Sequence, residues 1–221
     1  MCVCDDHRVS RNLTKIAVVG LLMAGLTANQ PSAHADSCPE VEVVFARGTG
    51  APPGIGVVGQ AFVDSLRANA PTKTIGVYAV NYPAGIDFGN SSTLGANDVN
   101  AHLQTMVVDC PGTEFVLAGF SQGANVIELV TGTEGAAWGY SAPLPPAVAD
   151  RVAAVALFGN PARKSGRASF TQTNSRYGDK SIDLCAIGDP VCSNGVNLPV
   201  HGAYVQIGAT AEAASFVAGH L

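Results

Sequence analysis

Five short apolar segments, separated by longer stretches with helical patterns, constrain the fold of this chain most strongly. They are rich in valine and other residues that favour strands, and they span residues 41–48, 74–83, 114–120, 152–161 and 181–188. The helical patterns span residues 57–70, 92–110, 122–132 and 209–221. Apolar runs of this kind are typical of strands buried in a parallel sheet. The alternation therefore predicts right-handed crossovers and an α/β three-layer sandwich around a five-stranded, mainly parallel sheet.

The N-terminal residues have the pattern of a secretory signal peptide. Three basic residues precede an apolar run at 16–28, and Ala-His-Ala at 33–35 is a small-residue cleavage site. The run of 13 residues is shorter than a membrane span of roughly 18 residues, and no later stretch reaches that length. We expect residues 1–35 to be a signal peptide and residues 36–221 to form a single extracellular or cell-wall-associated domain, without stable membrane insertion. The basic residues are Arg8, Arg11 and Lys15.

The composition fits one domain with a substantial core, since 47% of the residues are apolar and 13% are charged. Without residues 1–35 the chain holds nine basic and fifteen acidic residues, a net charge of −6. This acidic balance argues against a nucleic-acid partner. The three histidines after residue 35 form no ligand cluster in the sequence, and no phosphate-binding loop is recognisable, so neither a metal ion nor an organic cofactor is expected.

Four of the six cysteines follow the predicted signal peptide. An even number in an exported chain favours two disulfides over free buried thiols, although four cysteines allow three pairings. Cys185 and Cys192 are close enough in sequence to close a small loop. That leaves Cys38 to pair with Cys110, a bridge that would fix an otherwise frayed N-terminal end.

The sequence Gly-Phe-Ser-Gln-Gly at 119–123 matches the pattern of a nucleophile elbow. In such an elbow a serine lies on a sharp turn from strand to helix, and the two glycines let neighbouring chain pass close by. The pattern alone is weak in a chain with 25 glycines. Here it falls between a predicted strand and a predicted helix, so we predict that Ser121 is a nucleophile rather than an ordinary turn serine.

A serine hydroxyl needs a base, and His201 is the histidine best placed to serve as one. It follows the last predicted strand, at the same edge of the sheet as Ser121, and the alternative is a structural loop histidine. His102 precedes the serine in a predicted helix, against the order serine, acid, histidine of α/β-hydrolases, and His220 is the penultimate residue.

The acid that orients this histidine is predicted to be Asp189. It follows the fifth predicted strand, within Cys-Ala-Ile-Gly-Asp-Pro-Val-Cys at 185–192, where a carboxylate can reach the imidazole and hold its tautomer. A disulfide across this loop would stiffen it, and an ordinary Asp-Pro turn is the alternative. Other acidic residues lie on or near the nucleophile helix, in a turn, inside a strand or at the opposite edge of the sheet: Glu128, Glu134, Asp179, Asp183 and Asp150.

Two residues are candidates for an oxyanion hole. The backbone N–H of Gln122 lies at the start of the helix after Ser121. Thr49, in the loop after the first predicted strand, offers both a backbone N–H and a hydroxyl, with a plain turn threonine as the alternative.

Residues 133–148 form a glycine- and proline-rich stretch that we predict to be a loop. Its apolar residues either contact a lipid substrate or pack against the body of the domain. The larger ones are Trp138, Tyr140 and Leu144.

These motifs together resemble the cutinase family, and specifically its secreted actinobacterial members. The resemblance covers essentially the whole chain from Cys38 onward and includes Phe-Ala-Arg-Gly-Thr-Gly, the serine elbow, the aspartate in its short cysteine loop and Leu-Pro-Val-His-Gly-Ala-Tyr. It implies a compact α/β-hydrolase fold with a catalytic triad, an oxyanion hole and the two disulfides inferred above. The implied triad is Ser121, Asp189 and His201, and the implied oxyanion donors are Thr49 and Gln122.

The resemblance also implies a secreted serine esterase that hydrolyses short-to-medium-chain acyl esters, lipids or cutin-like polyesters through an acyl-enzyme. We expect a monomer that binds an ester or lipid substrate and no nucleic acid. Two alternatives stay open at this point. The same triad could serve a phospholipase, a thioesterase or an acyltransferase, and a secreted interaction protein could keep the fold without activity.

Overall fold

The computed structural model describes residues 38–132, 143–165 and 170–221. The predicted signal peptide, residues 1–35, lies outside the described residues, as do Trp138 and Tyr140 of the predicted loop. In the described part of the chain, no helix combines the length and the apolar character that a membrane crossing requires.

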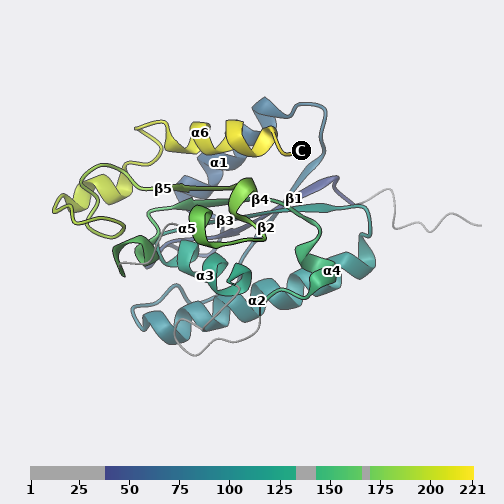
Figure 1. Cartoon of the computed structure of the whole chain (residues 1–221), viewed down its shortest axis with the longest axis horizontal. Helices are drawn as coiled ribbons and strands as arrows, with labels where there is room; N and C mark the ends of the chain where they lie inside the picture. Colours follow the sequence, from purple (N-terminus) through teal and green to yellow (C-terminus); the bar gives the residue numbers. More distant parts are fainter. Residues whose placement is uncertain (1–37, 133–142, 166–169) are drawn as a thin grey trace, which may run out of the picture. The chain divides into compact units, whose positions relative to one another are not determined.

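A parallel sheet forms the centre of the domain (Figure 1). Its strands are β1 (Val41–Ala46), β2 (Ile75–Ala79), β3 (Glu114–Phe120), β4 (Val152–Phe158) and β5 (Ser181–Leu184). They lie in the order β2-β1-β3-β4-β5, and every neighbouring pair is parallel. The predicted α/β fold and its five strands are therefore confirmed.

Helices cover both faces of this sheet (Figure 1). They are α1 (Gly56–Asn69), α2 (Phe88–Asp109), α3 (Gln122–Thr131), α4 (Pro146–Ala149), α5 (Phe170–Thr173) and α6 (Ala209–Ala218). α1 and α6 pack together on one face, whereas α2 and α3 pack together on the other. Since each face has its own helical layer, the domain is the three-layer sandwich that the alternation of patterns predicts.

The strands send alternate side chains into two apolar cores, one under each helical layer. On β1, Val44 and Ala46 belong to the core shared with α2 and α3, whereas Val43 and Phe45 belong to the core shared with α1 and α6. All residues of β1 are buried. A strand covered on both faces needs apolar residues at nearly every position, which explains why its sequence shows no alternation of apolar and polar residues.

Predicted and observed elements differ mainly at their ends. β1 ends at Ala46 rather than at residue 48, because Arg47 and Gly48 already belong to the loop at the carboxyl edge of the sheet. α2 begins at Phe88, earlier than the predicted start at residue 92. All strands except β3 thus end before the apolar segments that predicted them.

The prediction of a loop over residues 133–148 is wrong at its C-terminal end. Helix α4 begins at Pro146, and proline is favoured in the first turn of a helix because its missing N–H would have no carbonyl partner within the helix. Leu144 is buried, and its N–H donates to the carbonyl of Val130 at 2.9 Å. Of the two readings for this side chain, packing against the domain is therefore the correct one.

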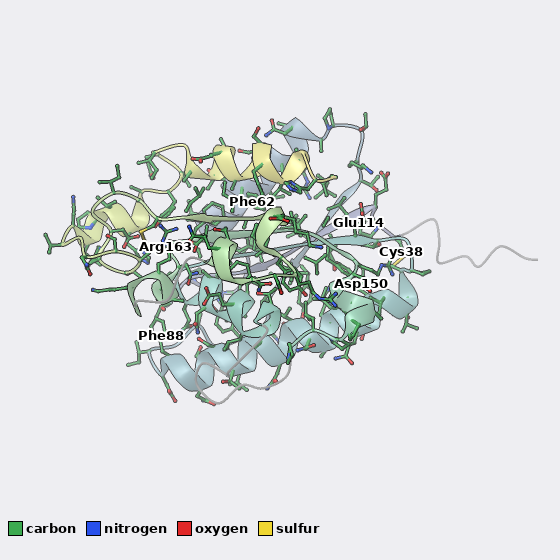
Figure 2. All side chains as sticks on the ribbon, in the orientation of Figure 1. Cys38, Phe62, Phe88, Glu114, Asp150 and Arg163 are labelled. Atoms are coloured by element: carbon green, nitrogen blue, oxygen red, sulfur yellow. A yellow bond between two sulfur atoms is a disulfide. The ribbon has the colours of Figure 1, made fainter. Side chains whose placement is uncertain are left out.

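The disulfide between Cys38 and Cys110 ties the start of the domain to the end of α2, with Cα atoms 5.6 Å apart. Figure 2 shows that Cys38, Glu114 and Asp150 lie at one edge of the sheet, whereas Arg163 lies at the other. Glu114 begins β3, so the first of these edges carries the amino ends of the strands. Asp150 accordingly lies far from the loops that follow the strands.

Candidate active site

The sheet has its topological switch point between β1 and β3, because the chain adds β2 on one side of β1 and β3 on the other. Open parallel sheets bind ligands at the carboxyl ends of the strands at such a point. β1 leads there into the loop that contains Thr49, and β3 leads directly into Ser121. Two of the sequence motifs therefore meet where the topology favours a site.

Ser121 has the strained backbone of a nucleophile elbow. Its φ of 56° and ψ of −118° lie outside the regions that a residue with a Cβ atom prefers. The strain is fixed on both sides, since Ser121 N–H donates to the carbonyl of Phe158 at 2.8 Å and Ser121 C=O accepts the N–H of Ala124 at 3.0 Å. Strain held in this way by its surroundings is common at functional sites.

The two glycines of the elbow are required by close backbone contacts. A Cβ atom on Gly119 would lie 2.2 Å from the carbonyl oxygen of Gly123. A Cβ atom on Gly123 would lie 1.9 Å from the carbonyl oxygen of Ala46, at the end of β1. The first turn of α3 therefore packs directly on the ends of β1 and β3, and the turn at Ser121 is sharp because this packing leaves no room for a wider one.

His201 lies in the short 3-10 helix η5 (Leu198–Gly202). Its ring stacks on Phe120, the residue before Ser121, with ring centroids 4.8 Å apart. It also lies against Gly159, where a Cβ atom would be 2.8 Å from His201 Cε1. The carbonyl of Phe158, directly before Gly159, accepts the Ser121 N–H. The imidazole therefore packs between the residue before Ser121 and the residue after its hydrogen-bond acceptor.

Asp189 holds this imidazole from its other side. Nδ1 of His201 lies 2.7 Å from Oδ2 of Asp189, and the carboxylate is fully buried. Burial acts to raise the pKa of Asp189, but hydrogen bonds from His201, from the Tyr204 hydroxyl and from the Val191 N–H outweigh it and lower the pKa below its usual value. The carboxylate is therefore ionised at neutral pH and accepts the Nδ1–H of His201, which leaves Nε2 free to act as a base.

The loop that carries Asp189 is closed by the second predicted disulfide, Cys185–Cys192, with Cα atoms 5.8 Å apart. Within the loop the N–H of Val191 donates to Asp189 Oδ1 at 2.8 Å, and directly after the loop Ser193 Oγ donates to the Asp189 carbonyl at 2.6 Å. These contacts fix the carboxylate before any ligand arrives.

The candidate oxyanion donors lie beside the elbow. Gln122 is the first residue of α3, where backbone N–H groups have no carbonyl within the helix. Its side chain accepts from Ser91 Oγ at 3.1 Å and donates to the Gly85 carbonyl at 2.8 Å, so it holds the loop before α2 against the elbow. Thr49 is exposed in the turn after β1. The oxyanion roles of both residues stay predictions.

Arg47 holds the loop of Thr49 in shape, a role that sequence reasoning missed. The guanidinium is buried, and it donates to the carbonyls of Ala51, Val80 and Tyr82 at 2.9, 3.3 and 2.6 Å. The Tyr82 hydroxyl in turn donates to the Arg47 carbonyl. The sequence carries one signal for this role, because Arg47 directly follows an apolar strand. An arginine buried there needs several hydrogen-bond acceptors, and the carbonyls of nearby loops can supply them.

The other histidines do not join the site. Nε2 of His102 lies 2.7 Å from Oε2 of Glu42, between α2 and the beginning of β1. His220 follows α6 and contacts the carbonyl of Phe216. Among the described residues, no group of three or more histidine, cysteine or acidic side chains could hold a metal ion.

Asp183 on β5 is a buried carboxylate near the site but separate from it. Asn160 Nδ2 donates to Asp183 Oδ2 at 3.4 Å and to Glu128 Oε1 at 2.8 Å. Asp183 Oδ1 lies 3.7 Å from the Arg163 guanidinium and accepts no hydrogen bond from the described residues. Burial raises the pKa of Asp183 to about 6, and Arg163 and Asn160 oppose the rise without cancelling it.

The fold and the geometry of this site define an α/β-hydrolase. The chain belongs to the cutinase family, which it matches over residues 37–221. Carboxylesterase Culp1 of Mycobacterium tuberculosis is 45% identical over 211 residues, 93% of this chain and 93% of that protein. Phospholipase Culp4 of the same species is 47% identical over 215 residues, 96% of this chain and 93% of that protein. The structure of Trichoderma reesei cutinase with a phosphonate inhibitor superposes with a TM-score of 0.67 at 31% identity, over 82% of this chain and 76% of that one.

We predict that Asp183→Asn stabilises the protein at neutral pH. The folded state raises the pKa of Asp183 from 3.8 to about 6, so the folded state binds the proton more tightly and the free energy of unfolding falls as pH rises through this window. Removal of the charge should recover about 3 kcal/mol at pH 8 and under about 1 kcal/mol at pH 4. Thermal unfolding at both pH values tests this, with the exposed Asp179→Asn as control. A variant that loses stability at pH 8 would contradict the burial cost.

Proposed function

We propose that this protein is a secreted serine esterase that hydrolyses carboxylic esters through Ser121, His201 and Asp189. The observation that carries the proposal is the buried Asp189–His201 pair, whose imidazole lies on Phe120 beside the strained serine. The relatives named carboxylesterase and phospholipase both act on esters according to their names, which supports ester hydrolysis.

The reaction proceeds in two acyl-transfer steps. Ser121 Oγ attacks the ester carbonyl while His201 Nε2 takes its proton, and Asp189 stabilises the imidazolium that forms. The backbone N–H groups of Gln122 and Thr49 bind the oxyanion. His201 then gives its proton to the leaving alcohol, and an acyl-enzyme on Ser121 remains. A water molecule activated by His201 hydrolyses this ester in the second step and releases the acid.

Exposed apolar side chains around the site favour water-insoluble or lipid-like esters. They lie at the carboxyl edge of the sheet, in the loop before α2, in the loop that contains Asp189, in the segment before η5 and at the start of η5 itself. The residues are Ile86, Ile187, Val196 and Leu198, with exposed fractions of 93%, 99%, 95% and 64%. We call them the apolar rim. Side chains of this kind contact acyl chains or a lipid surface without any electrostatic attraction, which fits a chain of net charge −5.

Export fits the two disulfides, which persist in oxidising compartments. Phospholipid hydrolysis is a second candidate activity, favoured by the 47% identity to Phospholipase Culp4. The scissile bond is again an acyl ester, so the same triad would serve, and the two activities differ in what the apolar rim contacts.

We predict that the oxidised protein hydrolyses p-nitrophenyl esters and that its rate peaks at one acyl chain length between acetate and palmitate. Ser121→Ala and His201→Ala should each lower kcat by about 10³-fold or more, and Asp189→Ala somewhat less, since the triad acts as a unit. His220→Ala is the matched histidine control and should retain its activity. Phosphatidylcholine vesicles, assayed beside the esters, test the phospholipase candidate. A folded wild-type protein that hydrolyses none of these substrates would favour the interaction-protein alternative.

We predict that the apolar rim matters more for insoluble esters than for soluble ones. Ile187→Ser combined with Leu198→Ser should lower the ratio of tributyrin-emulsion to p-nitrophenyl acetate activity about 30-fold, because each of the two lost apolar contacts costs roughly 1 kcal/mol. Val108→Ser is the matched control, since Val108 is 75% exposed near the end of α2 at the opposite edge of the sheet. An unchanged ratio in the double variant would contradict the proposal that the apolar rim contacts insoluble substrates.

A further inference from the structure

We propose that Tyr204 is a positioning residue of this site, which holds Asp189 and limits how strongly that carboxylate attracts the proton of His201. The proposal rests on the proposed triad. It follows from four features of the tyrosine: its burial, its hydroxyl bonds, its ring contacts and the carboxylate oxygen that it shares with the histidine.

The hydroxyl of Tyr204 makes two hydrogen bonds to the loop closed by Cys185 and Cys192, which we call the acid loop. It donates to Asp189 Oδ2 at 2.7 Å and accepts the N–H of Ala186 at 3.1 Å. Tyr204 itself is fully buried. A buried phenol with a donor and an acceptor this close is fixed in one orientation.

The direction of the phenol proton follows from its neighbours. Cys192 Sγ lies 3.4 Å from the hydroxyl, but it belongs to a disulfide, so it has no hydrogen to donate and is a weak acceptor. Asp189 is charged and closer, so the Tyr204 hydroxyl donates its one hydrogen to this carboxylate in a charge-assisted hydrogen bond. Burial raises the pKa of Tyr204, and the Asp189 charge adds to the rise, so the phenol keeps this proton.

The ring of Tyr204 contacts the segments that carry the other two residues. It packs edge-on against the His201 ring, with centroids 6.3 Å apart, and against Phe120, with centroids 5.6 Å apart. Phe120 directly precedes Ser121. A single side chain therefore contacts the acid, the base and the strand end that leads to the nucleophile.

The shared oxygen gives this residue an electrostatic effect. Oδ2 of Asp189 accepts both from Tyr204 and from Nδ1 of His201, whereas Oδ1 accepts from Val191. Each donor withdraws negative charge from the oxygen that the other uses. Loss of the phenol proton donor would leave Asp189 more basic, which strengthens its hold on a protonated imidazole.

Other charged groups near the pair come from β5 and the 3-10 helix η3 (Pro161–Ser165). Asp183 contributes a buried carboxyl next to Arg163, and Lys164 Nζ donates to the Pro190 carbonyl at 2.9 Å, in the acid loop. These groups are unchanged in a Tyr204→Phe variant, so they do not account for a difference between that variant and the wild type.

The test is Tyr204→Phe, which removes one oxygen and keeps the ring. We expect two midpoints to move up by about one pH unit in this variant: that of the acidic limb of the kcat/KM profile and that of the His201 titration. The titration is followed by NMR, and the His201 signal is assigned by its absence from His201→Ala. Tyr177→Phe is the matched control: Tyr177 is 2% exposed and packs in the other core, next to α5. Its two profiles should coincide with those of the wild type.

Profiles of Tyr204→Phe that coincide with the wild type would overturn the proposal, even if kcat falls. If Tyr204→Phe does not fold, 3,5-difluorotyrosine at position 204 replaces it, because its more acidic phenol is a stronger donor and should move both midpoints down. An unchanged midpoint in that variant would overturn the proposal too. The NMR titration needs no turnover, so a protein without esterase activity would contradict the proposed function and still test Tyr204.

Discussion

The contact between the first turn of α3 and the ends of β1 and β3 is the constraint on which the site depends. Only glycine fits at positions 119 and 123, where a Cβ atom would lie 2.2 Å and 1.9 Å from backbone oxygens. This packing forces Ser121 to a φ of 56° at the switch point of the sheet. The nucleophile position is therefore a consequence of backbone packing, and the loops of the site are arranged around it.

Each of those loops is fixed by contacts that do not involve a substrate. A disulfide and two hydrogen bonds hold the acid loop. Arg47 holds the loop of Thr49 through three carbonyls, and the Gln122 side chain holds the loop before α2. A site arranged in advance has little reorganisation to make during the reaction, which is how hydrogen-bond donors and dipoles contribute most to acyl transfer. Two residues of the apolar rim, Ile86 and Ile187, lie on these same fixed loops.

The strands and the main helices could be predicted from the sequence because their apolar patterns are local. The elbow could also be predicted, because Gly-Phe-Ser-Gln-Gly falls between a predicted strand and a predicted helix. Asp189 and His201 could be proposed as its partners because both follow the last predicted strand. The roles of Tyr204 and Arg47 and the raised pKa of Asp183 could not be predicted, because they come from contacts with residues far away in the sequence. The burial of Leu144 was undecided for the same reason, and the order of the strands in the sheet is likewise a tertiary property.

The most direct test of the central proposal is covalent labelling of the intact, oxidised protein with a p-nitrophenyl alkyl phosphonate, followed by intact-mass measurement and peptide mapping. We predict one adduct per chain, located on Ser121, absent from Ser121→Ala and formed at least 100-fold more slowly in His201→Ala. Failure of the folded wild type to react, or an adduct that persists in Ser121→Ala, would contradict the assignment of Ser121 as an activated nucleophile.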